Sequence, residues 1–84
     1  MIDFSIFPNP TTGELKVDLT QYAGLPVRIE VYNLQGHLLQ FAELDEVQTA
    51  VESIDLSDNT DGMYLIRVKS AGMSDVMKRV VLAR

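Results

Sequence analysis

Apolar and polar residues alternate with a period of two along most of this chain, in short runs separated by turn-forming residues. Within residues 14–19, for example, Leu15, Val17 and Leu19 alternate with charged neighbours. A period of two places the apolar side chains on one face of a strand, so each such run predicts a half-buried strand. The runs expected to form strands span residues 4–7, 14–19, 27–31, 38–44, 50–56, 63–69 and 74–82.

The same alternation assigns side chains to faces. In the last run we expect Val76, Lys78, Val80 and Leu82 on one face, with Met77, Arg79 and Val81 on the other. Aromatic and flexible apolar side chains within such runs are typical of a core. We therefore expect five of them to pack inside, with the tyrosine hydroxyls at the rim: Tyr32, Tyr64, Met63, Met73 and Met77.

Clusters of Gly, Pro, Asn, Asp and Ser separate the runs. These residues favour turns because they adopt or preset the required backbone angles. Short strands with such regular turns predict an all-β, antiparallel β-sandwich. Two local alternatives remain open at this point: a helix over residues 34–46, and a β-bulge within residues 51–54, where alternation breaks.

Composition narrows the class of protein. A chain of 84 residues predicts a single domain, residues 1–84, and 46% hydrophobic with 23% charged residues is typical of a globular one. The absence of cysteine excludes disulfides and thiolate metal sites. A net charge of −5 argues against nucleic acid as a partner, because that binding depends on neutralising phosphates.

Charge is distributed unevenly along the chain. Residues 1–61 hold 11 acidic and 2 basic residues, whereas residues 62–84 hold 5 basic and 1 acidic. One interpretation is that the C-terminal strands pair with acidic neighbours across the sheet. The other is a basic C-terminal region recognised by an acidic partner.

Candidate reaction chemistry is sparse. The single histidine, His37, follows Gly36 in a predicted turn, and the paired carboxylates Asp58 and Asp61 also lie in a turn, where they usually cap backbone N–H groups. Residues 55–62 resemble a calcium loop only loosely, since the required Gly and Glu positions are occupied by Thr60 and Ile66. We therefore expect no catalytic residues, no cofactor, no metal and no small-molecule substrate.

Four motifs follow one another in a distinctive order. Residues 7–13 read Phe-Pro-Asn-Pro-Thr-Thr-Gly, residues 31–36 end in a glycine turn, and residues 61–64 read Asp-Gly-Met-Tyr. The chain closes with Lys-Arg-Val-Val-Leu at residues 78–82. The ordered set closely resembles the type A C-terminal sorting domain of the type IX (Por) secretion system of Bacteroidetes, over almost the whole chain.

The resemblance extends to individual residues. Pro8 and Pro10 remove two backbone donors, which prevents an opening linker and turn over residues 1–13 from extending a sheet, and Gly36 permits a tight turn. Asp61 precedes Gly62 where the family often has Pro or Ala, and Arg84 stands near the family's second terminal lysine. The residues implied as the sorting motif are Pro8, Asn9, Pro10, Gly13, Gly36, Gly62, Tyr64, Lys78, Arg79, Val80, Val81, Leu82 and Arg84.

The resemblance also implies a fold and a role. Such domains are Ig-like sandwiches of about seven strands. They follow an N-terminal passenger protein through the periplasm to the outer-membrane type IX translocon, and a sortase-like surface protease then usually removes them. The passenger ends at the cell surface or is secreted. A terminal signal strand over residues 73–84 would carry much of the recognition, and edge-strand pairing is one conceivable mode.

The main alternative is a non-catalytic accessory module of a secreted protein, either carbohydrate-binding or adhesive. A carbohydrate-binding module would need exposed, coplanar aromatic rings, and the chain offers few candidates. An adhesion module would be favoured by outward apolar side chains in residues 38–44.

Overall fold

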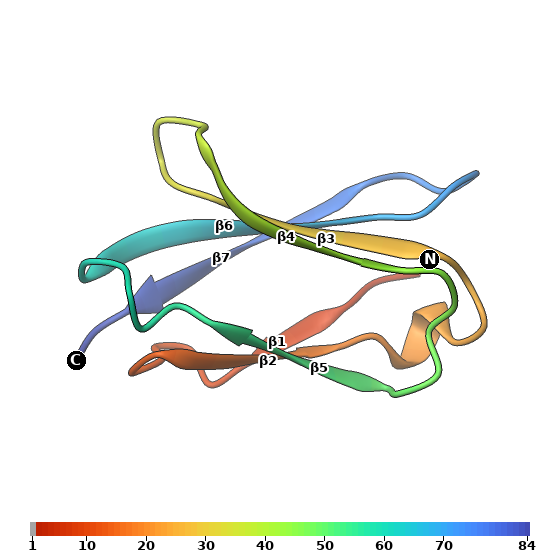
Figure 1. Cartoon of the computed structure of the whole chain (residues 1–84), viewed down its shortest axis with the longest axis horizontal. Coiled ribbons are helices and arrows are strands. Elements are labelled where there is room, and N and C mark those ends of the chain that lie inside the picture. Colours follow the sequence, from red (N-terminus) through yellow and green to blue (C-terminus); the bar gives the residue numbers. More distant parts are fainter. Residues whose placement is uncertain (1) are drawn as a thin grey trace.

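Two antiparallel sheets pack face to face in the computed structural model, which describes residues 2–84 (Figure 1). The smaller sheet has the order β1-β2-β5 and the larger has the order β4-β3-β6-β7. The strands are β1 (Ser5–Phe7), β2 (Glu14–Asp18), β3 (Val27–Tyr32), β4 (Leu38–Leu44), β5 (Val51–Asp55), β6 (Gly62–Lys69) and β7 (Val76–Leu82). The predicted all-β sandwich is confirmed.

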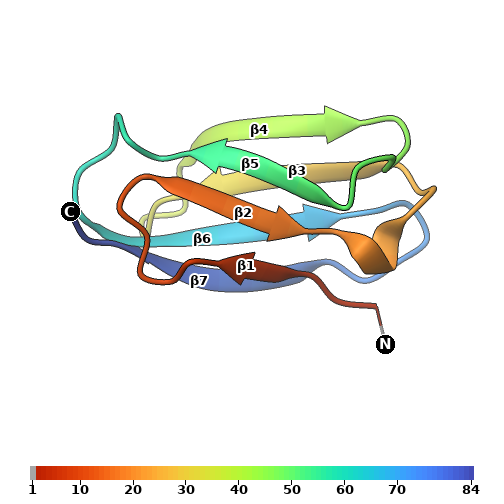
Figure 2. The same ribbon diagram turned by 90° about the horizontal axis from the view of Figure 1, so that it is seen from below.

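The order of the strands is Ig-like. The chain leaves the three-stranded sheet after β2, forms the β3–β4 hairpin, returns for β5 and completes the four-stranded sheet with β6 and β7 (Figure 2). Every strand pair is antiparallel. As a result, β7 is an edge strand of the larger sheet, and β1, in the other layer, overlaps it when the sandwich is seen from below (Figure 2).

The alternation predicted strand positions well and two local details poorly. The helix considered for residues 34–46 is wrong, because β4 occupies most of that range. The bulge considered within residues 51–54 is also absent, because β2 and β5 pair without a shift. The irregularity lies instead between Val31 and Tyr32, opposite β4. A short 3-10 helix, Thr20–Tyr22, was not predicted; Asp18 Oδ1 accepts the Thr20 N–H (2.9 Å) at its start.

Side chains from both sheets fill the space between the layers. The side chains that alternation assigned to inward faces and that are most buried are Leu15, Val17, Leu19, Ile29, Val31, Ile66, Val68, Val80 and Leu82. Met73 packs partly against this core, as expected. Three other expectations are wrong: Tyr32, Met63 and Met77 lie on the outer face of the four-stranded sheet, because their positions alternate with inward-facing neighbours.

Tyr64 anchors the start of β6. Its ring is buried, and its hydroxyl donates to the carbonyl of Thr60 (2.5 Å), four residues upstream. This is the arrangement of the tyrosine corner found in Ig-like sandwiches, where it holds the preceding loop against the sixth strand. The expectation of a core ring with a hydroxyl at the rim is confirmed for Tyr64.

The buried hydroxyl of Tyr22 allows a comparison with that of Tyr64. Tyr22 Oη is buried and has no hydrogen-bond partner among residues 2–84, and burial, with a smaller effect of Asp3, raises the pKa of Tyr22. We expect Tyr22→Phe to leave the free energy of unfolding unchanged or raise it by about 0.5–1 kcal/mol, because it removes an unsatisfied polar group. Tyr64→Phe should lower it by about 1–2 kcal/mol. Urea unfolding of the two variants measures the contrast, and a larger loss for Tyr22→Phe would contradict it.

Candidate recognition surface

The two sides of β7 have different environments. Val80 and Leu82 are buried, and Lys78 lies on the same inward-facing side. Met77, Arg79 and Val81 lie on the outer face, beside Arg67, Leu65 and Met63 of β6 respectively. The faces assigned from the sequence are confirmed, and the closing motif therefore presents only alternate side chains to a partner.

Lys78 joins the two ends of the chain. Its Nζ lies 3.2 Å from Asp3 Oδ2 and 5.6 Å from the centre of the Phe4 ring. Phe4 is buried in the core, so the ammonium group of Lys78 lies over a buried aromatic ring and also reaches a carboxylate. This geometry gives Lys78 a structural role in attaching the N-terminal segment to the terminal strand.

The N-terminal motif lies along the free edge of β7. Asn9 Oδ1 accepts the Val81 N–H (3.0 Å), and Asn9 Nδ2 donates to the Arg79 carbonyl (3.1 Å). Beyond it, the Thr11 N–H donates to the Val81 carbonyl (2.8 Å), and the Thr11 carbonyl accepts the Ala83 N–H (2.9 Å). The side chain of Asn9 and the backbone of Thr11 thus form the hydrogen bonds of the exposed edge of β7 between residues 79 and 83. Pro8 and Pro10, which lack N–H groups, flank Asn9, and both of their preceding peptide bonds are cis.

The edge contact of Asn9 predicts a local opening. We expect Asn9→Ala to speed hydrogen exchange of the Val81 amide about five- to tenfold, since one hydrogen bond to that amide is lost at a net cost of about 1 kcal/mol. The amide of Ile66, in the middle of the sheet, should exchange at the unchanged rate. NMR-detected exchange measures both, and equal rates at Val81 in the two proteins would contradict the assigned role.

Arg84 fastens the C-terminal end to the β5–β6 loop. Its Nε lies 3.2 Å from Asp61 Oδ1, and its terminal nitrogens donate to the carbonyls of Ser57 and Asn59. The carboxylate of Asp55 accepts the Ser57 N–H (2.8 Å), which caps the turn. Hydrogen bonding with the Ser57 side chain, and then with its backbone, lowers the pKa of Asp55. Two of the acidic residues considered as a calcium loop are therefore engaged: Asp55 with the loop backbone, and Asp61 with Arg84.

The glycines of the motif set lie in the turns around this end. Gly13 is buried, its carbonyl accepts the Leu56 N–H (2.8 Å), and a Cβ at this position would lie 3.4 Å from Ser57 Cβ. Gly62 begins β6 next to Asp61. Both residues line an open pocket whose other side is formed by residues 33–35, in the turn that contains Gly36. Gly36 has a φ of +89°, which strongly favours glycine. The structure thus gathers Gly13, Gly36, Gly62 and Arg84 at the end of the sandwich that carries the C-terminus (Figure 1).

His37 has a structural environment. It is exposed in the β3–β4 turn, where its N–H donates to Asn33 Oδ1 (2.9 Å) and its ring Nδ1 lies 3.4 Å from Asn33 Nδ2. Exposed aromatic rings do not form a shared platform either. Phe7 is 45% exposed and Phe41 is 54% exposed, but they lie on different sheets. Nowhere in residues 2–84 is there a helix that is both long enough and apolar enough to span a membrane.

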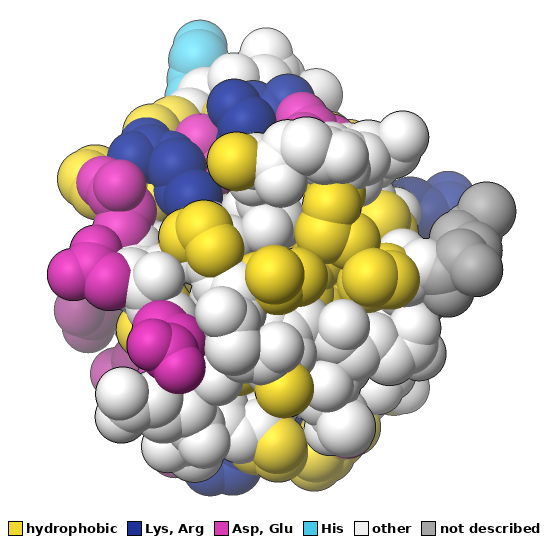
Figure 3. Space-filling model, turned by 90° about the vertical axis from the view of Figure 1, so that its right-hand side faces the viewer, with side chains coloured by type: hydrophobic (Ala, Val, Ile, Leu, Met, Phe, Trp, Pro, Cys, Tyr) yellow, Lys and Arg dark blue, Asp and Glu magenta, His cyan; other side chains and the backbone are white. Residues whose placement is uncertain are grey.

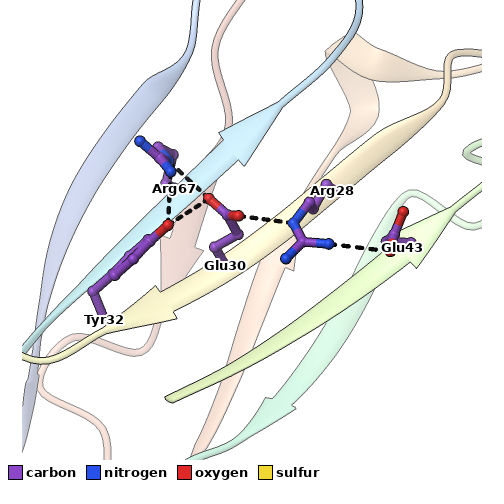
Figure 4. A network of polar contacts seen from close by, with 5 residues as sticks. All are labelled: Arg28, Glu30, Tyr32, Glu43 and Arg67. Atoms are coloured by element: carbon purple, nitrogen blue, oxygen red, sulfur yellow. Dashed lines mark hydrogen bonds and ion pairs between the residues drawn. The ribbon is translucent and has the colours of Figure 1, made fainter. Parts of the chain in front are cut away.

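A polar network covers the outer face of the four-stranded sheet (Figure 4). Glu30 projects outward from β3, yet it is only 4% exposed. Its Oε2 lies 2.7 Å from Arg28 Nε, and its Oε1 accepts from Arg67 Nε (2.8 Å) and from the Tyr32 hydroxyl (2.9 Å). Arg28 also reaches Glu43 (3.1 Å) and stacks over the Phe41 ring at 4.0 Å.

The network fixes the charge of Glu30. Burial by itself raises the pKa of Glu30, but the hydrogen bonds from Arg28, Arg67 and Tyr32, with the charge of Arg67, outweigh it and lower the pKa to about 2. The same contacts raise the pKa values of Arg28 and Arg67, chiefly through the hydrogen bonds to Glu30. The network was not predicted from the sequence. Its one sign there is Glu30, a charged residue in the middle of the run that forms the central strand β3.

The uneven charge is only partly explained by pairing within the domain. Three of the five C-terminal basic residues form ion pairs: Arg67 with Glu30, Lys78 with Asp3, and Arg84 with Asp61. Lys69 and Arg79 form none with an acidic side chain of residues 2–84. Pairing with acidic residues therefore accounts for three of the five, and recognition of the basic region by an acidic partner stays a prediction.

These features define a small Ig-like sandwich whose distinctive motifs lie beside its terminal strand. The sequence model of the secretion system C-terminal sorting domain matches residues 5–83, and the chain belongs to this family, the sorting domains of type IX secretion. No curated protein matches the chain significantly. Membership defines a sorting signal attached to a passenger protein and exported with it across the outer membrane by the type IX machinery.

Proposed function

We propose that this domain is a secretion signal that is removed after export. It follows a passenger through the periplasm, engages the outer-membrane translocon, and is cut off by a sortase-like surface protease once the passenger is outside. The observation that carries this proposal is the family match over residues 5–83, which leaves almost none of the chain for another function. The domain itself performs no catalysis on this proposal.

The proposed sorting motif divides into two groups of residues. Arg79, Val81 and Arg84 expose side-chain atoms that a translocon component can contact. The remaining motif residues act through the fold that presents them, because they are buried, lie in turns or bind the edge of β7: Pro8, Asn9, Pro10, Gly13, Gly36, Gly62, Tyr64, Lys78, Val80 and Leu82. Recognition and folding are thus assigned to different residues of the motif set.

A fusion experiment tests the proposal. Residues 1–84 are attached to a fluorescent passenger that carries a Sec signal peptide, in a bacterium with a type IX system. The comparison is a fusion that stops after Gly72 and so lacks β7. We expect the intact fusion at the cell surface or in the medium, and the truncated one in the periplasm. Mass spectrometry of the exported passenger should show loss of the 9.4 kDa domain.

Other outcomes separate the parts of the proposal. Export of a passenger that still carries the domain would contradict removal but leave the sorting role intact. Periplasmic retention of the intact fusion, with the domain folded, would overturn the sorting role and make the accessory module the better hypothesis. The exposed apolar side chains of β4, namely Leu38, Leu39 and Phe41, would then be the first surface to test for adhesion.

A further inference from the structure

The outer face of β6 and β7 combines cations with apolar side chains in a regular pattern. Register places Arg79 beside Leu65, and Met77 beside Arg67, so a cation on one strand neighbours an apolar side chain on the other. Val81 and Met63 complete the same face as an apolar pair. We refer to these six residues, together with Lys69, as the β6–β7 face.

The apolar members of this face are available for contact. Met63 is 37% exposed and Met77 is 48% exposed, although both are large apolar side chains that normally gain from burial. Arginine and methionine are enriched in protein–protein interfaces, where the arginine supplies hydrogen bonds and the methionine adapts to its neighbours. An interface that covered the β6–β7 face would bury both kinds of group.

The charge of this face is opposite to that of the molecule. The face carries three basic residues, Arg67, Lys69 and Arg79, of which Arg67 is paired with Glu30 of β3, and β6 and β7 contain no acidic residue, in a chain of net charge −5. Arg79 and Lys69 have no ion-pair partner in residues 2–84. The outer face of the three-stranded sheet carries Glu14, Asp18 and Asp55 against Lys16 alone. Figure 3, which views one end of the molecule, shows basic groups toward the four-stranded side and acidic groups along a flank.

We propose that the β6–β7 face docks onto an acidic protein surface that also carries apolar side chains. This proposal rests on the sorting function. The partner is a component of the export machinery whose surface places carboxylates opposite Arg79 and Lys69. Charge complementarity selects this partner, because opposite potentials speed encounter and like charges reject wrong surfaces. The two exposed methionines supply the contact area that a purely ionic surface would lack.

The test uses the fusion of residues 1–84 with three single variants. Arg79→Glu reverses an exposed, unpaired charge on the face, and Met77→Ser removes an exposed apolar contact. Lys16→Glu is the matched control, since it reverses a charge on the outer face of the opposite sheet. We expect Arg79→Glu to reduce export about tenfold and Met77→Ser about threefold, while Lys16→Glu exports like the unmodified fusion. Urea unfolding of the purified variants verifies that each is folded.

The remaining outcomes overturn the proposal in distinguishable ways. Normal export of both face variants, while the fusion that ends at Gly72 fails, refutes the docking face and leaves the sorting function in place. Periplasmic retention of the unmodified fusion refutes the sorting function and the docking proposal with it. Two further measurements identify other occupants: a dimer of the purified domain that Arg79→Glu dissociates points to a second copy, and Arg79-dependent binding to phosphatidylglycerol vesicles points to a lipid surface.

Discussion

Replacing Glu30 with glutamine should lower the free energy of unfolding by about 2–3 kcal/mol, a large share of the stability of so small a domain. Glutamine keeps the shape of the side chain but removes the charge that Arg28 and Arg67 share. Its amide would also place donors against two guanidinium groups. Urea unfolding at pH 7 measures the difference between the two proteins.

The pH dependence of this difference has a definite sign. The folded-state pKa of Glu30 is about 2, below its ordinary value of 4.5, so the stabilisation by the carboxylate is fully present above pH 4.5 and is lost as the pH falls toward 2. The gap between the two proteins should therefore narrow over that interval. Glu43→Gln is the control, because Glu43 pairs with a terminal nitrogen of Arg28 and its side chain is 63% exposed. This substitution should lower the free energy of unfolding by less than about 0.5 kcal/mol. Equal losses for the two variants would contradict the network.

Shortening Leu82 to alanine should lower the free energy of unfolding by about 2–4 kcal/mol, whereas the same change at the adjacent Val81 should cost less than about 1 kcal/mol. Leu82 is 1% exposed and lies in the core, while Val81 lies on the outer face beside Met63. Deleting buried methyl groups loses transfer free energy and leaves a cavity in the core. At Val81 both costs are smaller, because its side chain is partly exposed on the outer face. Thermal or urea unfolding of the two variants measures the contrast.

This contrast bears on how export data are interpreted. A loss of export in Leu82→Ala reports unfolding of β7 rather than a lost contact, whereas a loss in Val81→Ala reports the exposed surface. Val80→Ala is a second core variant and should behave like Leu82→Ala, because Val80 is fully buried. Similar stabilities for the variants at residues 81 and 82 would mean that the sides of β7 are assigned wrongly.

The alternation of apolar and polar residues placed most of the strands, because these strands bury one face in a single shared core. The exception is β4, which has no buried side chain and was predicted from its many apolar residues. The core positions expected for Tyr32, Met63 and Met77 rested on their apolar character rather than on alternation, and apolar character alone does not distinguish the core from an apolar outer face. The bulge at Val31 was missed for a different reason. It depends on how β3 pairs with β4, and pairing is a property of two strands rather than of one run.

The motifs at the two ends of the chain could be found in the sequence, but their relation to each other could not. Asn9 and Val81 are 72 positions apart, and only the folded sandwich brings the Asn9 amide to the edge of β7. Likewise, Lys78 stood out as a terminal cation, but its contact with Asp3 and Phe4 requires the N-terminal segment to pack beside β7. Long-range pairing of this kind leaves no local pattern.

The backbone of Thr11 runs parallel to β7 at Leu82, and the two ends of the chain lie toward opposite ends of the long axis (Figure 1). A force that pulls the ends apart therefore acts along β7 and loads the bonds of Asn9 and Thr11 in shear. Bonds in shear must rupture together, whereas bonds that are peeled rupture one at a time. On the proposed function, tension between a passenger at the N-terminal side and a machine bound to the C-terminal strand would load this shear-resistant arrangement.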